Sequence, residues 1–352
     1  MELPFGALAR PNKHATLSNT YSRPRPLSPG SEMTSEQTFD ETVTTLSEAS
    51  VTAHFDAFTD IAWDDPDYEI SWSDPRWVLP DVDPLGRHPW YRSLPVERQI
   101  EIGIWRQANV CKVGRTFEEI LIGGIMAFAI TLPNGRPEFR YITHEATEEC
   151  HHTQMFQEFV NRSGADVPGA RPLFRRAGPF ISLAGQFTPA LFWAGVLAGE
   201  EPIDHIQKAY LRSDVELHPL IERIMQIHVA EEARHISFAH RYLRETVATY
   251  RPVRRLLLSL AFPLIMRVLC DVIVIPPREM TDALAIPKSV IREAFWDHAD
   301  SARQLRDVFA DVRALATEAG LMNPVARQMW RLLGIDGPAS RYRSEPARRS
   351  AP

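Results

Sequence analysis

Two short segments of this chain repeat one spacing of acidic and histidine residues inside long helical stretches. The first reads TEECHH and begins at residue 147, and the second reads AEEARH and begins at residue 230. Side chains three or four positions apart lie on one face of a helix, so each segment presents a glutamate beside a histidine: Glu149 with His152, and Glu232 with His235. A single match of this kind is usually solvated. Two matches on two helices favour a bundle in which both faces point inward.

The surrounding sequence predicts an all-α fold with four long central helices. Apolar residues recur at helical spacing, and no run alternates as a strand would. Pro219 suits a first helical turn, whereas Pro202 lies inside the third helix and is expected to bend it. The central helices are predicted at residues 96–130, 140–164, 188–213 and 218–250, and further helices at residues 253–275, 288–319 and 323–334.

The remaining sequence suggests four parts along the chain. Residues 1–40 are rich in Pro, Ser and Thr and are predicted to be a disordered tail, in which translation could start at Met1 or at Met33. Residues 41–95 are crowded with Trp, Pro and Asp and are predicted to be an irregular or short-helix lead-in that packs on the core. Residues 96–335 would form the helical domain, and residues 336–352 a flexible tail.

Composition excludes several classes of protein. The net charge of −6 argues against a nucleic-acid-binding surface. The three cysteines, Cys111, Cys150 and Cys270, are too widely spaced for a disulfide framework, which fits a reducing, cytoplasmic compartment. Cys150 is expected to pack in the core. The most apolar segment, residues 256–266, is too short to span a bilayer and is predicted to be a buried helix.

The first and third helices each carry an acid where an apolar residue is expected. One turn either side of Glu118 the neighbours are apolar, whereas those of Glu119 are polar. Glu200 shares its face with apolar residues, so it is preferred, with Glu201 as the alternative. An isolated carboxylate is costly in an apolar position, and metal coordination is one of the few ways to offset that cost.

These acids complete a set that could hold two metal ions inside a four-helix bundle. Such sites take one glutamate from each of two helices and a Glu-x-x-His from each of the other two. A third imidazole, His228, lies one turn before Glu232. The candidate ligands are Glu118, Glu149, His152, Glu200, His228, Glu232 and His235. Oxygen ligands mixed with imidazole suit iron, with manganese as an alternative, and the absence of thiolates argues against structural zinc.

Other polar residues near these ligands are expected to play smaller parts. Glu148 and His151 rotate off the ligand face and are predicted to be solvated or to support a ligand. Asp204 lies one turn after Glu200 and could orient a ligating imidazole. A redox role for Tyr141, two turns before Glu149, has no support in the sequence. The remaining histidines lack a partner at ligand spacing and are predicted to be structural: His88, His144, His205, His218 and His240.

With these motifs, residues 75–335 resemble the AurF-like p-aminobenzoate N-oxygenases, di-iron enzymes that oxidise aryl amines to nitro compounds. The resemblance rests on GRHPW, FEE, EECHHTQM, AGEEPID and IHVAEEARH. It implies a ferritin-like bundle with additional helices, two iron ions held by the seven candidate ligands, O₂ as co-substrate, an external reductase or small electron donor, and a homodimer. The extra histidine ligand of this family falls on His228.

The resemblance is weaker for the substrate. Family members that act on p-aminobenzoate use an arginine on the first helix to hold the substrate carboxylate, and Cys111 and Val113 occupy the corresponding positions here. Lys112 and Arg115 are near in sequence but are expected to point elsewhere. The apolar first helix therefore favours a more hydrophobic or larger substrate.

Four functions are compatible with the sequence. The leading hypothesis is a di-iron oxygenase that transfers oxygen to an amine nitrogen of a small-molecule substrate. A C-hydroxylase or desaturase on the same scaffold differs only in the reaction. A non-catalytic ferritin-like metal-binding protein would need neither the third histidine nor the Trp-rich lead-in. A bundle with solvated Glu and His residues would bind no metal.

Overall fold

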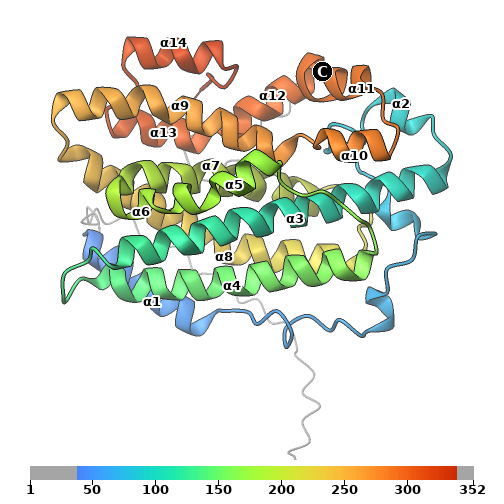
Figure 1. Cartoon of the computed structure of the whole chain (residues 1–352), viewed down its shortest axis with the longest axis horizontal. Helices are drawn as coiled ribbons and strands as arrows, with labels where there is room; N and C mark the ends of the chain where they lie inside the picture. The colour runs from blue at the N-terminus through green and yellow to red at the C-terminus, as the bar shows by residue number, and fades with distance from the viewer. Residues whose placement is uncertain (1–37, 339–352) are drawn as a thin grey trace, which may run out of the picture. The chain divides into compact units, whose positions relative to one another are not determined.

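A computed structural model describes residues 38–338, and within that range it contains helices and turns but no strand (Figure 1). The four predicted central helices are α3 (Val96–Ala129), α4 (Pro137–Ser163), α7 (Pro189–Leu211) and α8 (Pro219–Ala248). The α4 helix ends at Gly164, whose φ of 67° suits the left-handed cap that glycine adopts most readily. The all-α prediction is confirmed, and α7 is assigned as one helix through Pro202.

A polar band crosses the bundle between two apolar clusters. At one end Trp193 of α7 packs edge-on against Phe238 of α8, with the ring of Tyr141 4.7 Å from that of Phe238. At the other end Phe156 and Phe159 of α4 belong to a second cluster, which includes Ile221 and Ile224 of α8. The candidate ligands of α4 and α8 lie between these clusters in sequence on both helices. Close-packed side chains therefore flank the polar band on both sides.

The lead-in contains more regular structure than its sequence suggests. A 14-residue helix, α1 (Phe39–Thr52), packs on α4, and its start is fixed by a capping box between Thr38 and Glu41. Two short 3-10 helices follow, η1 (Pro66–Tyr68) and η2 (Pro75–Trp77), and then a four-residue α-helix, α2 (Pro89–Arg92). The predicted tails lie mostly outside the described residues, although α1 begins inside residues 1–40. The boundary at residue 96 stays a prediction.

Two helices occupy the Pro- and Gly-rich connection between α4 and α7. They are α5 (Pro172–Ser182) and α6 (Ala184–Phe187). Pro172 sits in the first turn of α5, where its missing N–H costs little. The α6 segment approaches α3 so closely that a Cβ at Gly185 would lie 2.0 Å from the carbonyl oxygen of Gly124. Only glycine fits this contact, which holds the connection against the bundle.

The C-terminal segment is more broken than predicted. Residues 288–319 are mostly helical, as predicted, but they form several short helices. One break falls at His298, which adopts an extended conformation and caps the next helix with its side chain. The structure contains, in order, α9 (Pro252–Val274), α10 (Arg278–Ala283), α11 (Lys288–Arg292), a π-helical turn η3 (Glu293–Asp297), α12 (Ala299–Val308), α13 (Ala310–Glu318) and α14 (Pro324–Leu332).

Residues 256–266, predicted to form a buried helix, lie in α9, which is buried on one face only. Leu258, Phe262 and Met266 lie in the core, whereas Leu256, Leu257, Leu264 and Val268 are exposed. Within the described residues, the stretch Pro252–Ala283 is long and apolar enough to cross a membrane by length and composition. One such helix is weak evidence for a span, and the absence of a stable span stays a prediction.

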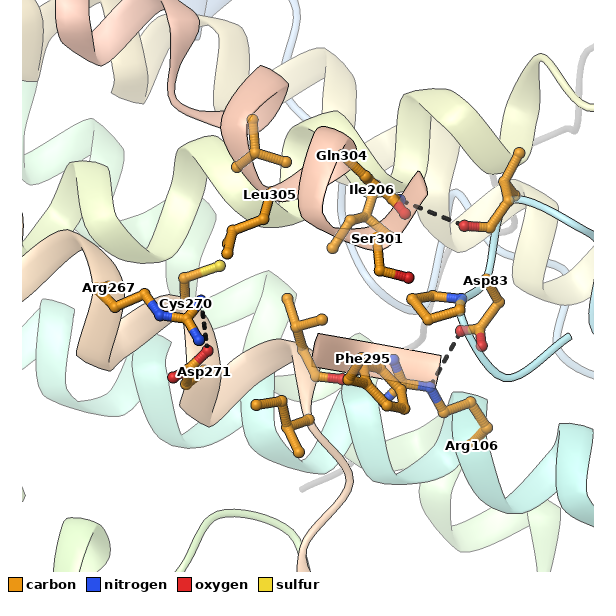
Figure 2. Close-up of a pocket in the computed structure, with 15 residues that line it drawn as sticks. Asp83, Arg106, Ile206, Arg267, Cys270, Asp271, Phe295, Ser301, Gln304 and Leu305 are labelled. Atoms are coloured by element: carbon orange, nitrogen blue, oxygen red, sulfur yellow. Dashed lines mark hydrogen bonds and ion pairs between the residues drawn. The ribbon is translucent and has the colours of Figure 1, made fainter. Parts of the chain in front are cut away.

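A buried ion pair connects the lead-in to the bundle. Asp83 accepts a hydrogen bond from Arg106 of α3 at 3.1 Å and another from Tyr210 of α7 at 2.9 Å. The Arg106 guanidinium lies 5.5 Å from the centre of the Phe295 ring (Figure 2). The cavity beside this pair measures about 40 Å³. That is room for a water molecule but not for an organic substrate, so the pair has a structural role.

Replacing Asp83 with asparagine should lower the free energy of unfolding by about 3–5 kcal/mol, the usual cost of leaving one charge of a buried pair unmatched. The amide keeps the shape of the carboxylate but cannot neutralise Arg106, whose side chain is 4% exposed. Urea unfolding followed by circular dichroism measures the change. Asp81→Asn is the control, because Asp81 pairs with Arg92 at the surface. Equal losses in the two variants would contradict this account.

Candidate metal centre

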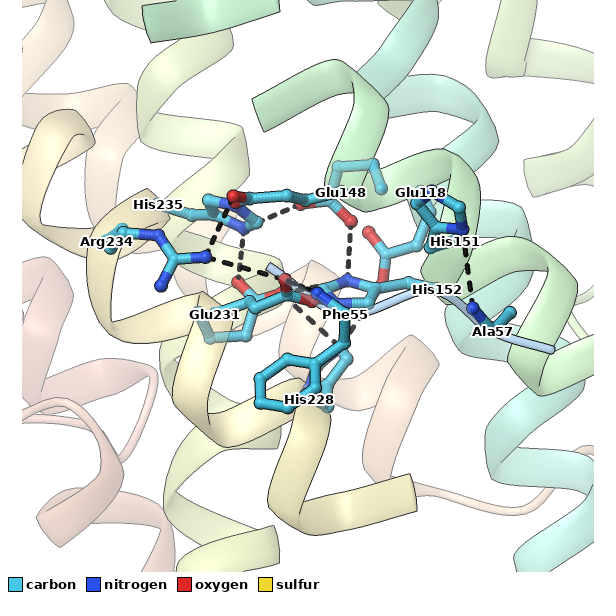
Figure 3. A network of polar contacts seen from close by, with 12 residues as sticks. Phe55, Ala57, Glu118, Glu148, His151, His152, His228, Glu231, Arg234 and His235 are labelled. Atoms are coloured by element: carbon cyan, nitrogen blue, oxygen red, sulfur yellow. Dashed lines mark hydrogen bonds and ion pairs between the residues drawn. The ribbon is translucent and has the colours of Figure 1, made fainter. Parts of the chain in front are cut away.

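The seven predicted ligands meet in the middle of the bundle. Figure 3 labels four of them: Glu118, His152, His228 and His235. Helices α3 and α7 each contribute one glutamate, α4 contributes a glutamate and a histidine, and α8 contributes a glutamate and two histidines. All seven side chains are at most 3% exposed: Glu118, Glu149, His152, Glu200, His228, Glu232 and His235. Residues separated by more than a hundred positions in the chain therefore face one another across a water-excluded centre.

Two carboxylates lie between the two motif histidines. Glu149 places one oxygen 3.0 Å from Nδ1 of His152 and the other 2.8 Å from Nδ1 of His235. Glu232 does the same from the opposite helix, at 3.4 Å and 3.3 Å. Each carboxylate thus spans both histidines. Inward-facing Glu-x-x-His pairs on two helices are the ligands with which such bundles hold two metal ions.

His228 presents a free nitrogen lone pair to the same centre. Its Nδ1–H donates to the side-chain oxygen of Gln207 on α7 at 2.9 Å, which fixes the proton on that nitrogen. Its Nε2 lies 3.5 Å from Glu232 and 3.6 Å from Glu118 and has no hydrogen-bond partner. Burial lowers the pKa of His228 to about 4, so the ring is neutral at pH 7, as a metal ligand must be.

The two motifs support each other across the bundle through their first glutamates. Glu148 of α4 accepts a hydrogen bond from Nε2 of His235 at 2.7 Å, and Glu231 of α8 accepts one from Nε2 of His152 at 2.8 Å. A carboxylate accepts but does not donate, so each Nε2 carries a proton and each Nδ1 is turned toward the centre. Of the two roles predicted for Glu148, solvated or supporting, the structure has the supporting one.

Glu231 was missed in the sequence, although a signal for it was present. Both motifs read Glu-Glu-x-x-His, so the role of Glu148 in one predicts the role of Glu231 in the other. Two further groups anchor Glu231: Arg234, at 3.5 Å, and the backbone N–H of Phe55 in the lead-in, at 3.0 Å. Arg234 also donates to Glu148 at 2.8 Å. One guanidinium therefore partly neutralises both supporting carboxylates.

Burial raises the pKa of Glu118 and of Glu200 well above the usual range, and repulsion from the carboxylates of Glu149 and Glu232 adds to this effect. Burial alone would lower the pKa of His152, but the carboxylate of Glu149 beside it raises that pKa well above its usual value. The centre thus favours added positive charge, either as protons or as cations.

Several atoms of the centre are buried without a hydrogen-bond partner among the described residues. They are the orphaned oxygens Glu118 Oε2, Glu149 Oε1, Glu200 Oε2 and Glu232 Oε1, and the nitrogen His228 Nε2. Buried polar atoms in folded proteins are nearly always satisfied. Together with His152 and His235, these residues form three groups of three that could hold a metal ion. Within each group the candidate ligand atoms lie within 4.8 Å of one another. The donor set and its unsatisfied atoms therefore fit a pair of hard or intermediate cations.

The two choices between adjacent glutamates are settled as far as their orientation goes. Glu119 is exposed and pairs with Arg115 at 3.3 Å, whereas Glu118 points into the centre. Glu201 is buried but turns away and binds Nε2 of His240 at 2.5 Å, whereas Glu200 joins the centre. The structure therefore brings Glu118 and Glu200 into the centre, and their role as metal ligands stays a prediction.

The predictions for Asp204 and Cys150 are wrong, whereas that for His218 agrees with the structure. Asp204 does not orient an imidazole but binds Lys208 at 2.6 Å, and Gln207, nearly one turn further on, holds His228 instead. Cys150 was expected to pack but is exposed. His218 has a structural role, since its ring stacks on that of Trp77 with centres 4.2 Å apart.

Comparison with known proteins gives one family. The model of the p-aminobenzoate N-oxygenase AurF family matches residues 36–320. Uncharacterized proteins of Mycobacterium tuberculosis (Rv0885) and Mycobacterium bovis (Mb0909) are each 54% identical over 308 residues, which cover 88% of this chain and 91% of each relative. No solved structure matches the chain.

Glu118→Gln should weaken binding of ferrous iron by at least about tenfold, because it removes a charged oxygen from the buried centre. Anaerobic titration with ferrous iron, followed by metal analysis after gel filtration, measures the change. Glu119→Gln is the matched control, since its side chain lies at the surface beside Arg115. Loss of iron in the Glu119 variant with full retention in the Glu118 variant would overturn the orientation described above.

The stability of the metal-free protein should fall as pH rises from about 4.5 to about 8, in part because of Glu145. Burial raises the pKa of this carboxyl from 4.5 to about 8. In that range the unfolded chain releases the proton while the folded chain keeps it. The contribution of Glu145 to the free energy of unfolding is complete below pH 4.5 and is lost as pH rises through about 8. Between these values the free energy of unfolding should fall by about 1.4 kcal/mol per pH unit.

Urea unfolding of metal-free protein between pH 5 and pH 8 tests this slope. Glu145→Gln should flatten it, because the amide does not titrate. Glu138→Gln provides the control, since Glu138 is also buried on α4 but pairs with Arg136. An unchanged slope in the Glu145 variant would mean that this carboxyl is ionised in the folded protein.

Proposed function

Because the chain belongs to the p-aminobenzoate N-oxygenase AurF family, we propose that it is a di-iron oxygenase that uses O₂ to oxidise the nitrogen of an aryl amine. The observation that carries the proposal is the crossed pair of Glu-Glu-x-x-His motifs. Each motif supplies a carboxylate that spans both motif histidines and a second carboxylate that orients the histidine of the other helix.

The seven buried side chains would hold two iron ions, with manganese as the alternative metal. Glu149 and Glu232 would be the central members of this set, since each has one oxygen near each motif histidine. Glu118, Glu200 and His228 would complete the ligand set from one side of the centre. When bound, the two ions would supply reductive activation of O₂ and transfer of one oxygen atom to the substrate.

The protein's own residues prepare the centre for this chemistry. Gln207, Glu148 and Glu231 each hold one imidazole proton on the nitrogen that faces away from the centre. The inward nitrogens therefore keep their lone pairs for coordination. The apolar clusters at both ends of the band exclude water, which protects reactive oxygen species from side reactions.

The reaction needs electrons from outside the protein. Conversion of an aryl amine to a hydroxylamine consumes one O₂, two electrons and two protons: one oxygen atom is inserted into an N–H bond, the O–O bond breaks, and the other oxygen leaves as water. A reductase or a small electron donor would supply the electrons, and we place the protein in the cytoplasm. A homodimer, as the family implies, is part of the proposal.

Incubation of the iron-loaded full-length protein with a reductant, isotopically labelled O₂ and a 4-substituted aniline tests the function. We expect a hydroxylamine or nitro product that carries the label. We also expect a loss of more than a hundredfold in rate for Glu232→Gln, which removes a charged candidate ligand from the centre. Glu245→Gln, at the exposed end of α8, is the control. Label on carbon would favour the hydroxylase hypothesis. Iron uptake without any O₂-dependent product would favour a metal-binding protein.

A further inference from the structure

An apolar cavity of about 450 Å³ adjoins the metal centre. It lies between α3, α5, α6, α7 and α9, and at its inner end it reaches Gly199 and Glu200. Its walls are almost entirely hydrocarbon, with Glu200 as the only ionisable side chain, and they include Phe117, Phe174, Leu191, Phe192, Val196 and Leu269. Binding pockets for small molecules are commonly of this size and composition.

Phe117, Gly199 and Glu200 line both this cavity and a much smaller space of about 30 Å³. The smaller space also contains the candidate ligands Glu118 and His228. The ring of Phe117 stacks on Phe174 with centres 4.8 Å apart. A Cβ at Gly199 would lie 3.1 Å from the ring of Phe117, so glycine at this position leaves room for the ring. A molecule in the cavity would therefore reach the centre beside Phe117 and Glu200.

Among the described residues, none that lines this cavity carries a cation that could neutralise a substrate carboxylate. The nearest basic residues of α3 are occupied elsewhere: Lys112 donates to the carbonyl of Val167 at 2.6 Å, and Arg115 contacts Gln157 and Glu119. An unpaired carboxylate in such surroundings would cost several kcal/mol. The cavity therefore selects against aminobenzoates.

The opening of the cavity is also apolar. Four of its lining residues reach the surface: Ile181, Leu191, Leu264 and Val268 are between 36% and 50% exposed. They come from α5, which packs on α3, and from α7 and α9, which pack on each other. All three helices are labelled above α3 in Figure 1. Exposed apolar side chains around a cavity mouth are typical of a binding groove. This use accounts for the exposure of Leu264 and Val268 on α9.

We infer that the substrate is an uncharged aryl amine with an alkyl or second aryl group in place of a carboxylate, bound in this cavity with its nitrogen at the Glu200 end. This inference rests on the proposed function for the choice of an amine. A cavity of about 150 Å³ is enough to hold benzene, so a 450 Å³ cavity has room for a ring and a substituent of several carbons. An aryl amine stays neutral at pH 7, so neither end of the molecule carries an unpaired charge.

Binding to the iron-loaded full-length protein under anaerobic conditions tests the inference without turnover. Isothermal titration with 4-hexylaniline and with 4-aminobenzoate should show at least tenfold tighter binding of 4-hexylaniline. Equal or tighter binding of 4-aminobenzoate would overturn the inference.

Gly195→Leu locates the binding site. A Cβ at Gly195 meets only Leu269, at 4.0 Å, so a leucine can enter the cavity without disturbing the packing. It should weaken 4-hexylaniline binding at least tenfold and leave the iron content unchanged. Leu257→Phe adds volume on the outer face of α9 away from the cavity and should leave binding unchanged. Unaltered binding in the Gly195 variant would mean that the ligand lies elsewhere.

Comparison of binding with product formation separates this inference from the proposed function. If 4-hexylaniline binds tightly, loses affinity in the Gly195→Leu variant and gives no oxidised product, N-oxygenation is refuted but the cavity assignment stands. If 4-aminobenzoate is oxidised and 4-hexylaniline does not bind, the proposed N-oxygenation stands but the cavity assignment is refuted.

Discussion

The rest of the structure depends on the burial of seven ionisable side chains in the middle of four helices. Four carboxylates and three imidazoles are placed within a few ångströms of one another and are almost completely inaccessible to water. Removing an unpaired ion from water costs several kcal/mol, and neighbouring carboxylates repel each other across a low-dielectric interior. Such a centre is compatible with a folded bundle only if positive charge is added. Protons on His152 and His235 can supply part of it, and two divalent cations would supply it all.

The architecture around the centre follows from this requirement. Crossed hydrogen bonds from Glu148 and Glu231 fix the histidines, and Arg234 partly neutralises the two supporting acids. The lead-in contributes a backbone donor from Phe55, which explains why a segment so far from the motifs in sequence packs over them. Apolar clusters at both ends of the band keep the helices together where the polar band itself contributes little cohesion.

The sequence predicts the four central helices and the facing of each candidate ligand, because both depend on spacing within one helix. It fails where the outcome depends on contacts between segments. The helices α5 and α6 are not predicted, because the segment that forms them is rich in proline. Their position depends on the close approach of Gly185 to α3. His298 interrupts a periodic run by capping the next helix. Gln207 replaces Asp204 as the support of an imidazole, since only the assembled bundle decides which polar residue of α7 reaches His228.

The same distinction separates the reaction from the substrate. Ligand motifs are local, because each depends on spacing within one helix. The cavity wall is assembled from five helices, and the residues that shape it are mostly ordinary apolar side chains and small glycines. No motif in the sequence marks Gly195 or Gly199 as important. Gly195 nevertheless leaves the cavity open, and Gly199 leaves room for the ring of Phe117. Substrate selection in this fold can therefore change through a few apolar positions while the charged centre stays the same.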